Sequence, residues 1–230
     1  MSANHAAFNL IFRFVENYVS PIAGRISSQR HVMAIRDGFI SAMPFMIVGS
    51  FLLVFAYPPF SPDTTWGFAR AWLDMAKQFE GQILTPFDMT MGVMSLYICA
   101  AIAYNLGKHY VKTHQLDPFM CAMLSLMAFL LVAAPKTKGA LPVDSLGGTG
   151  IFTAILVAIY CVEMMRFLKA HNIGTRLPDQ VPPMIKNSFD LLIPVLVVVL
   201  TLYPLSLLIQ SQFGMLIPQA IMSIFKPLVS

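Results

Sequence analysis

Charge is scarce in this sequence. Only 11% of its 230 residues are Asp, Glu, Lys or Arg, whereas a soluble domain has about a quarter. Hydrophobic residues make up 57%, and a soluble protein cannot hide that many apolar side chains and still cover its surface with polar groups. These proportions exclude a nucleic-acid-binding module and a disordered tail. They indicate a protein that crosses a membrane several times.

Cysteine is also sparse, and its pattern excludes a secreted disulfide scaffold. The three cysteines, Cys99, Cys121 and Cys161, are odd in number and each lies inside an apolar run, so we expect small core side chains. The sequence also lacks a glycine-rich phosphate loop, a nucleophile elbow and any His, Cys and acidic cluster at metal-ligand spacing. We therefore predict no catalytic residue, no metal and no cofactor.

What the sequence does contain is long apolar runs. A helix needs about 20 apolar residues to cross about 30 Å of hydrocarbon, and five segments qualify: 38–57, 87–106, 118–134, 148–167 and 189–209. The fourth ends with Glu163 and Arg166, three residues apart and so able to pair. The fifth contains Pro194 and Pro204, which bundled membrane helices tolerate.

Amphipathic segments flank these spans. Near the N-terminus, apolar residues from Phe8 to Val19 follow helical spacing up to Pro21, and residues from Ile217 to Leu228 do so near the C-terminus. Both are interpreted as helices in the headgroup plane, with ordinary packing against the bundle as the alternative. The predicted fold is an all-α integral membrane protein, with about five transmembrane helices plus amphipathic interfacial helices at both ends.

The distribution of positive charge predicts the orientation. Ten of the fifteen Lys and Arg residues lie before the first predicted span, between the second and the third, or from the end of the fourth to the start of the fifth. Because cytoplasmic segments are enriched in these residues, we expect a cytoplasmic N-terminus. The histidines all fall in the predicted cytoplasmic segments, where we interpret them as solvated loop residues: His5, His31, His109, His114 and His171.

Two sets of small or polar residues are candidates for packing and binding. Gly150, Ala154 and Ala158 form a stripe spaced by four, which lets helices approach closely within the chain or across a dimer. Thr90, Gly92 and Ser95 lie near the outer mouth of the second predicted span. Because hydroxyl groups and a glycine backbone at a bilayer edge can face a sugar, these three residues are candidate sugar contacts, with helix capping or packing as the alternative.

Four stretches together resemble a known family. They are PIAGRISSQRHVMAIRDGFISAMPFMIVGSFLL (21–53), TMGVMSLYICAAIAYNLG (90–107), RLPDQVPPMIKNSFDLLIP (176–194) and IPQAIMSIFKPLVS (217–230). In their order and spacing they resemble the N-terminal half of the lactose/cellobiose-type enzyme IIC permeases of the bacterial phosphoenolpyruvate-dependent sugar phosphotransferase system. The resemblance implies three parts: a cytoplasmic amphipathic segment (1–37), a five-span dimerising membrane domain (38–209) and an interfacial helix (210–230). The sugar-binding half, with its glutamate- and histidine-bearing hairpins, has no counterpart in the sequence.

The resemblance also implies a function. Such a permease works as a homodimer in the bacterial inner membrane and moves a β-linked disaccharide to a phosphorylated IIB partner, without a covalent intermediate of its own. The prolines of LPDQVPP rule out a continuous helix and form an elbow that is a candidate surface for this partner: Pro178, Asp179, Pro182 and Pro183. The alternative for the elbow is a plain loop before a helix. The alternative function is a membrane scaffold or dimerising subunit without transport.

Overall fold

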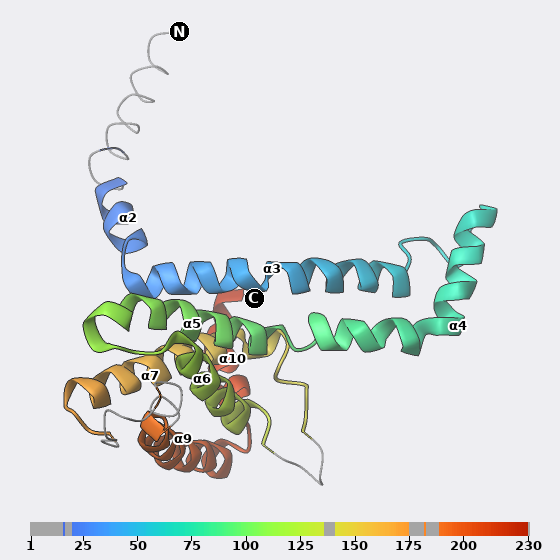
Figure 1. The fold of residues 1–230 in the computed structure, drawn as a ribbon. Coiled ribbons are helices and arrows are strands. Elements are labelled where there is room, and N and C mark those ends of the chain that lie inside the picture. The colour runs from blue at the N-terminus through green and yellow to red at the C-terminus, as the bar shows by residue number, and fades with distance from the viewer. Residues whose placement is uncertain (1–15, 17–19, 136–140, 175–181, 183–188, 230) are drawn as a thin grey trace, which may run out of the picture.

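The computed structural model describes residues 16, 20–135, 141–174, 182 and 189–229. The secondary structure of these residues is helical throughout (Figure 1). The helices are α2 (Ser20–Ser27), α3 (Arg30–Ala56), α4 (Gly67–Thr90), α5 (Met94–His114), α6 (Pro118–Ala133), the short η2 (Gly148–Gly150), α7 (Ile151–Ala170), α9 (Leu192–Phe213) and α10 (Ile217–Val229).

The all-α membrane fold is confirmed. Four helical stretches are long and apolar enough to cross a bilayer: Arg30–Ala56, Gly67–His114, Gly148–Ala170 and Leu192–Phe213. The apolar helix Pro118–Ala133 is shorter. Asp117 caps it by accepting a 2.8 Å hydrogen bond from the Phe119 N–H, and Pro118 occupies its first position, where no backbone N–H is needed.

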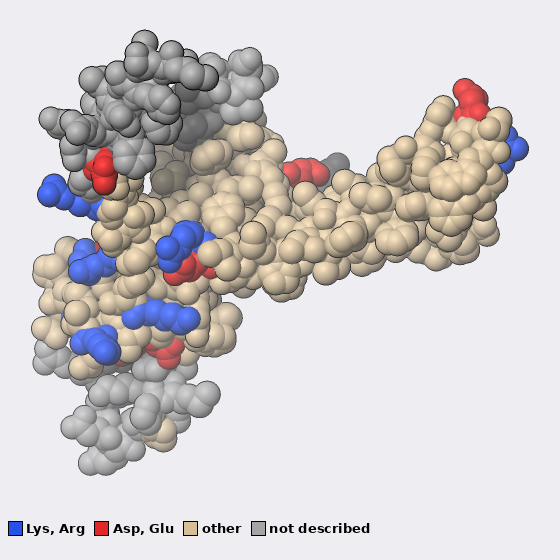
Figure 2. Space-filling view, turned by 90° about the horizontal axis from the view of Figure 1, so that it is seen from above, with Lys and Arg blue, Asp and Glu red and all other residues tan. Residues whose placement is uncertain are grey.

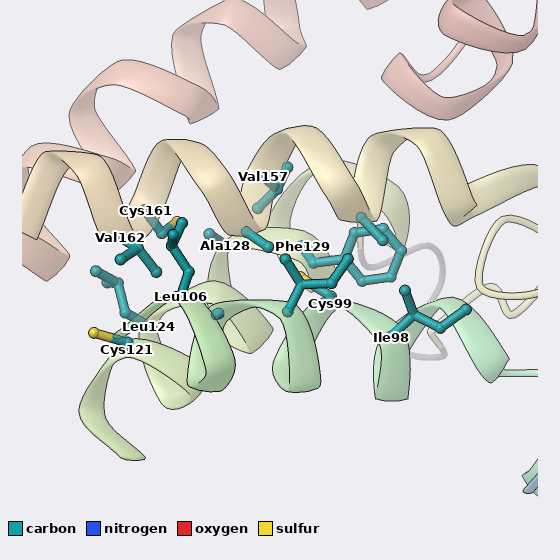
Figure 3. Close-up of a cluster of buried hydrophobic side chains, with 14 of the residues drawn as sticks. Ile98, Cys99, Leu106, Cys121, Leu124, Ala128, Phe129, Val157, Cys161 and Val162 are labelled. Carbon is teal, nitrogen blue, oxygen red and sulfur yellow. The ribbon is translucent and has the colours of Figure 1, made fainter. Parts of the chain in front are cut away.

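The core lies where α5 packs against α6 and α7, with α3 on its other side (Figures 1 and 3). Ile98, Leu106 and Phe129 are fully buried there. Cys99, Cys121 and Cys161 are free thiols in the same core, which confirms their interpretation as core residues. The core therefore joins α5 to α7, although α6 and the loop after it lie between these two helices in the sequence.

The second half of α3 and most of α4 extend away from this bundle, and we call residues 50–89 the arm (Figure 1). The two helices hold each other through a 3.2 Å hydrogen bond from Trp72 Nε1 to the Phe55 carbonyl and one of 2.9 Å from the Tyr57 hydroxyl to Glu80. The arm exposes many large apolar side chains, such as Phe51 and Phe68. Such a surface needs lipid or protein around it.

The second predicted span is wrong as a single helix over 87–106. The chain is helical to Thr90, turns at residues 91–93 and begins α5 at Met94. The loop before η2 contacts the chain just after this turn, where the Leu146 carbonyl accepts a 3.0 Å hydrogen bond from the Ser95 N–H. Apolar residues continue across the turn, so hydropathy gave no sign of it. Residues 67–86, which lie between the first and second predicted spans, form most of α4.

The helix ends also differ from expectation. The first long helix begins at Arg30, not Gly38, and α9 ends at Phe213, where Gly214 adopts a left-handed conformation (φ 65°) that suits glycine. At the N-terminal end, Phe8–Val19 lies outside the described residues, and helix α2 includes Pro21 in its first turn. At the other end, Ile217 and Pro218 of α10 are buried against the bundle whereas Ile224 is exposed. The alternative of a packed helix therefore holds for its first turn.

Candidate functional site

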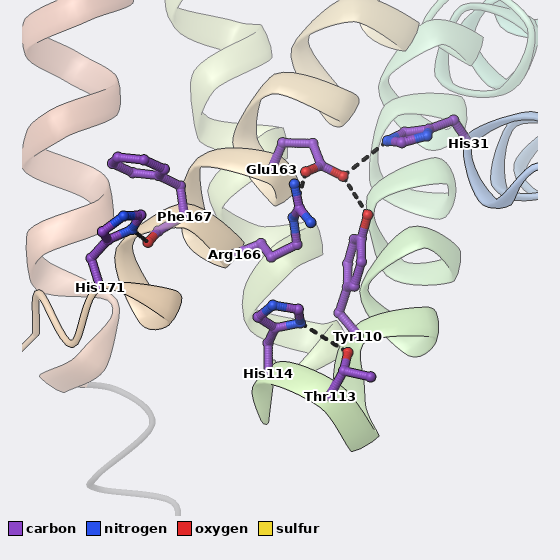
Figure 4. Close-up of polar contacts among 8 residues, drawn as sticks. All are labelled: His31, Tyr110, Thr113, His114, Glu163, Arg166, Phe167 and His171. Atoms are coloured by element: carbon purple, nitrogen blue, oxygen red, sulfur yellow. Dashed lines mark hydrogen bonds and ion pairs between the residues drawn. The ribbon is translucent and has the colours of Figure 1, made fainter.

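A cluster of ionisable side chains joins three helices at the end of the bundle where α3 begins and α5 and α7 end (Figure 4). Its centre is the carboxylate of Glu163 on α7. Oε1 lies 2.9 Å from His31 Nε2 on α3 and accepts a 2.5 Å hydrogen bond from the Tyr110 hydroxyl on α5. Oε2 lies 2.6 Å from Arg166 Nε, an ion pair in which the N–H is not aligned for a hydrogen bond. We call these four residues the Glu163 cluster.

Two arginines flank the aromatic member of this cluster. The guanidinium carbons of Arg30 and Arg166 lie 5.4 and 5.2 Å from the centroid of the Tyr110 ring, within the range of a cation–π contact. Tyr110 itself is 1% exposed, so its hydroxyl depends on Glu163 for an acceptor. The cluster can therefore fix how α3, α5 and α7 sit relative to one another. It contains no nucleophile poised beside a base.

The sequence placed Glu163 beside Arg166, and the ion pair confirms it. The solvated-loop interpretation is wrong for His31, which lies in the first turn of α3 and contacts Glu163. Its loop part is also wrong for His109 and His114, which belong to the last turns of α5. His109 is exposed, while His114 Nδ1 lies 2.8 Å from Thr113 Oγ1 and His171 Nδ1 lies 2.8 Å from the Phe167 carbonyl. His5 lies outside the described residues. A signal for the cluster existed, because the predicted orientation already put His31, Tyr110 and Glu163 at the same end of the bundle.

The candidate sugar contacts lie around the turn between α4 and α5. The Thr90 hydroxyl donates a 2.8 Å hydrogen bond to the Pro86 carbonyl. The Ser95 hydroxyl donates a hydrogen bond to the buried Leu146 carbonyl. A Cβ at Gly92 would lie 2.6 Å from the Asp88 carbonyl oxygen. These contacts account for the three residues as packing at the turn. Their contact with a sugar stays a prediction.

The small-residue stripe begins at Gly150, the last residue of η2, and continues on the inner side of α7. Ala154 and Ala158 are fully buried, and a Cβ at Gly150 would lie 2.6 Å from Ser95 Oγ and still closer to the Ser145 carbonyl. These contacts are within the chain. They account for the stripe as packing inside the bundle, and a role in a dimer stays a prediction.

The proline elbow lies almost wholly outside the described residues. Pro182 is described, as an exposed residue outside the helices, whereas Pro178, Asp179 and Pro183 are not. On the described side of the elbow, Lys169 Nζ donates a 2.8 Å hydrogen bond to Asp190 Oδ2, which links the end of α7 to the residues before α9. A cavity of about 140 Å³ adjoins this pair. Its volume is below the range of about 300–1,000 Å³ that is typical of small-molecule sites.

A second, larger cavity lies between α9 and α10. It has a volume of about 390 Å³ and its lining is apolar apart from Ser223, with Phe213 and Ile221 among the lining residues. Such a lining suits hydrocarbon better than a sugar, whose hydroxyls need hydrogen-bond partners. Among the described residues, no group of three or more His, Cys, Asp or Glu side chains is arranged to hold a metal ion.

The chain resembles known proteins along most of its length. The family model described as "Phosphotransferase system, EIIC" matches residues 36–229. A cellobiose-specific EIIC component from Geobacillus stearothermophilus is 36% identical, covering 81% of this chain and 43% of that protein. A lichenan permease IIC component from Bacillus subtilis is 33% identical, covering 88% and 46%.

A solved structure agrees with these sequence matches. The transporter ChbC, the IIC component of the N,N'-diacetylchitobiose-specific phosphotransferase system, has a TM-score of 0.79 and 31% identity, covering 94% of this chain and 51% of that protein. The chain thus spans about half the length of the relatives it matches. With its family match over residues 36–229, its all-helical membrane fold and this structural likeness, the chain belongs to the EIIC family of the phosphotransferase system.

Proposed function

We propose that this chain is the N-terminal membrane half of a sugar permease, which moves a β-linked disaccharide across the bacterial cell membrane for phosphorylation by a IIB partner. The observation that carries the proposal is the likeness to ChbC, which covers 94% of this chain at a TM-score of 0.79. The relatives' names support the sugar class, because cellobiose, lactose and diacetylchitobiose are all β-linked disaccharides. In this proposal the proline elbow faces IIB in the cytoplasm.

The arm supports a homodimer as the working unit. It stands away from the bundle, and its exposed side chains are large and apolar, among them Phe51, Phe55 and Phe68. A second copy seated against the arm would cover a surface of this kind. The same observation favours the second candidate function, a dimerising membrane scaffold that transports nothing itself.

Uptake measurements separate the two functions. In cells that lack their own cellobiose uptake but supply IIB and its phosphoryl donor, we expect no transport from this chain alone. Co-expression with the C-terminal half of the Geobacillus cellobiose-specific relative should give accumulation of cellobiose phosphate. Failure of the pair to transport, while both halves are present in the membrane, would favour the scaffold.

Sugar binding by the isolated chain gives a second test. The two cavities described above are a small one and an apolar one, and neither suits a disaccharide. We therefore expect purified chain in detergent to bind cellobiose no more tightly than about millimolar, a binding free energy of about −4 kcal/mol. Isothermal titration calorimetry measures this directly. Sub-millimolar binding would contradict the assignment of the main sugar contacts to the other half.

Cysteine labelling tests the proposed orientation. Lys112 is exposed at the end of α5 and the native cysteines are buried, so an introduced thiol reports without interference. We expect the Lys112→Cys variant to react with a membrane-impermeant maleimide only in inverted vesicles, and Lys138→Cys only in intact cells. The reverse pattern would place the N-terminus outside.

A further inference from the structure

One side of α5 carries an aromatic residue and two cations at its last turns. Tyr104, Lys108 and Lys112 repeat every four residues and all three are exposed, so they form a row on the outer surface, which we call the α5 row. Successive members lie about 6 Å apart along the helix axis. Lys108 Nζ lies 4.5 Å from the centroid of the Tyr104 ring.

The two lysines of the row have no carboxylate partner among the described residues. Within the described ranges, Arg36, Arg166 and Lys169 each pair with a carboxylate, whereas Lys108 and Lys112 do not. Arg25 and Arg30, from α2 and the start of α3, are also exposed cations without a carboxylate partner there. Figure 2 shows most of the Lys and Arg gathered at the bundle end, far from the tip of the arm. This end therefore has a positive field.

The row also marks a passage from hydrocarbon to water. Moving from Lys112 toward the middle of α5, the same face presents Lys108, then the ring of Tyr104, then Ala100. Tyrosine is enriched at the level of lipid headgroups, and anionic headgroups attract Lys and Arg next to the membrane. A docking surface for a soluble protein would not require the Tyr104 ring, which lies one helical turn closer to the middle of α5 than Lys108. The order of residues favours a lipid.

We propose that the α5 row binds an anionic phospholipid. The headgroup phosphate lies between Lys108 and Lys112, its glycerol lies beside the Tyr104 ring, and the acyl chains follow the apolar surface of α5 below it. Arg25 and Arg30 add to the attraction from the neighbouring helices. This site does not depend on sugar transport, so it can be tested even if the proposed function fails.

Native mass spectrometry of the full chain tests the site with dioleoyl phosphatidylglycerol as the probe and dioleoyl phosphatidylcholine as the neutral reference. We expect the Lys108→Gln/Lys112→Gln variant to bind phosphatidylglycerol at least about tenfold more weakly, since each cation near an anionic headgroup adds about 1 kcal/mol, or about fivefold. The Lys108→Arg/Lys112→Arg variant keeps the charge and should bind as the wild type does. Binding of phosphatidylcholine should be the same in all variants.

A matched control comes from the other end of the molecule. The Arg70→Gln/Lys77→Gln variant removes the same charge from two exposed residues of α4, and it should leave phosphatidylglycerol binding unchanged. Equal losses in the two double variants would show a non-specific charge effect and overturn the proposal. So would unchanged lipid binding in the Lys108→Gln/Lys112→Gln variant. If that variant instead loses affinity for the Geobacillus IIB protein, the row is a protein-docking surface and the lipid site is refuted.

Discussion

Replacing Glu163 by leucine should lower the free energy of unfolding by about 2 kcal/mol. The carboxylate is the shared partner of His31, Tyr110 and Arg166, and its removal leaves the buried Tyr110 hydroxyl without an acceptor. Breaking a fully buried ion pair costs about 3–5 kcal/mol, and an exposed pair contributes less than about 1 kcal/mol. The Glu163 side chain is 24% exposed, which places the cost between these limits. Unfolding by SDS in mixed dodecylmaltoside micelles measures it.

Two further variants separate the hydrogen bonds from the charge. Glu163→Gln keeps an acceptor for Tyr110 and removes the negative charge, so we expect a smaller loss than in Glu163→Leu. Tyr110→Phe removes the hydroxyl alone, and in the Glu163→Leu background it should cost almost nothing because its partner is already gone. If Glu163→Leu stayed within about 0.5 kcal/mol of the wild type, the range of ordinary surface substitutions, the cluster would have no structural role.

Much of the architecture could be predicted because the bilayer imposes a length on apolar runs. The predicted segments 118–134 and 148–167 agree closely with α6 and with η2 and α7. The Glu163–Arg166 pair followed from helical spacing alone. The three buried cysteines followed from their apolar neighbours. Each of these features depends on residues close together in the sequence, where the helical period is decisive.

The features that sequence reasoning missed depend on contacts between distant segments. Directly after the turn at residues 91–93, Ser95 donates to the loop carbonyl of Leu146, more than fifty residues later in the sequence, and no local pattern encodes this contact. The partnership of His31 with Glu163 spans 132 residues. The arm was missed for a different reason. Residues 67–86 contain four charged residues, Arg70, Asp74, Lys77 and Glu80. A search for long apolar runs with few or no charges therefore does not mark this segment as part of a membrane helix.

The approach of α3 to α5 depends on one residue without a side chain. A Cβ at Gly38 would lie 2.9 Å from the Ile102 backbone nitrogen and 3.0 Å from its Cα, with the Ile102 side chain closer still. Real Cβ atoms essentially never come so near to backbone atoms. The two helices can meet here only because position 38 is glycine, as is common where membrane helices pack closely. Ile102, opposite it, is fully buried in the core.

The Gly38→Leu variant should therefore lose about 3 kcal/mol of unfolding free energy, at the upper end of the usual cost of overpacking, because backbone atoms of α5 cannot rotate away as a side chain does. Gly81→Leu is the matched control. Gly81 lies within α4 with nothing within 4 Å of its added Cβ, so the same substitution should be neutral or stabilise the helix by up to about 1 kcal/mol. Micelle unfolding of the two variants side by side provides the test. Equal stability of both variants would contradict the α3–α5 crossing, whereas a loss confined to Gly38→Leu shows that the crossing governs stability.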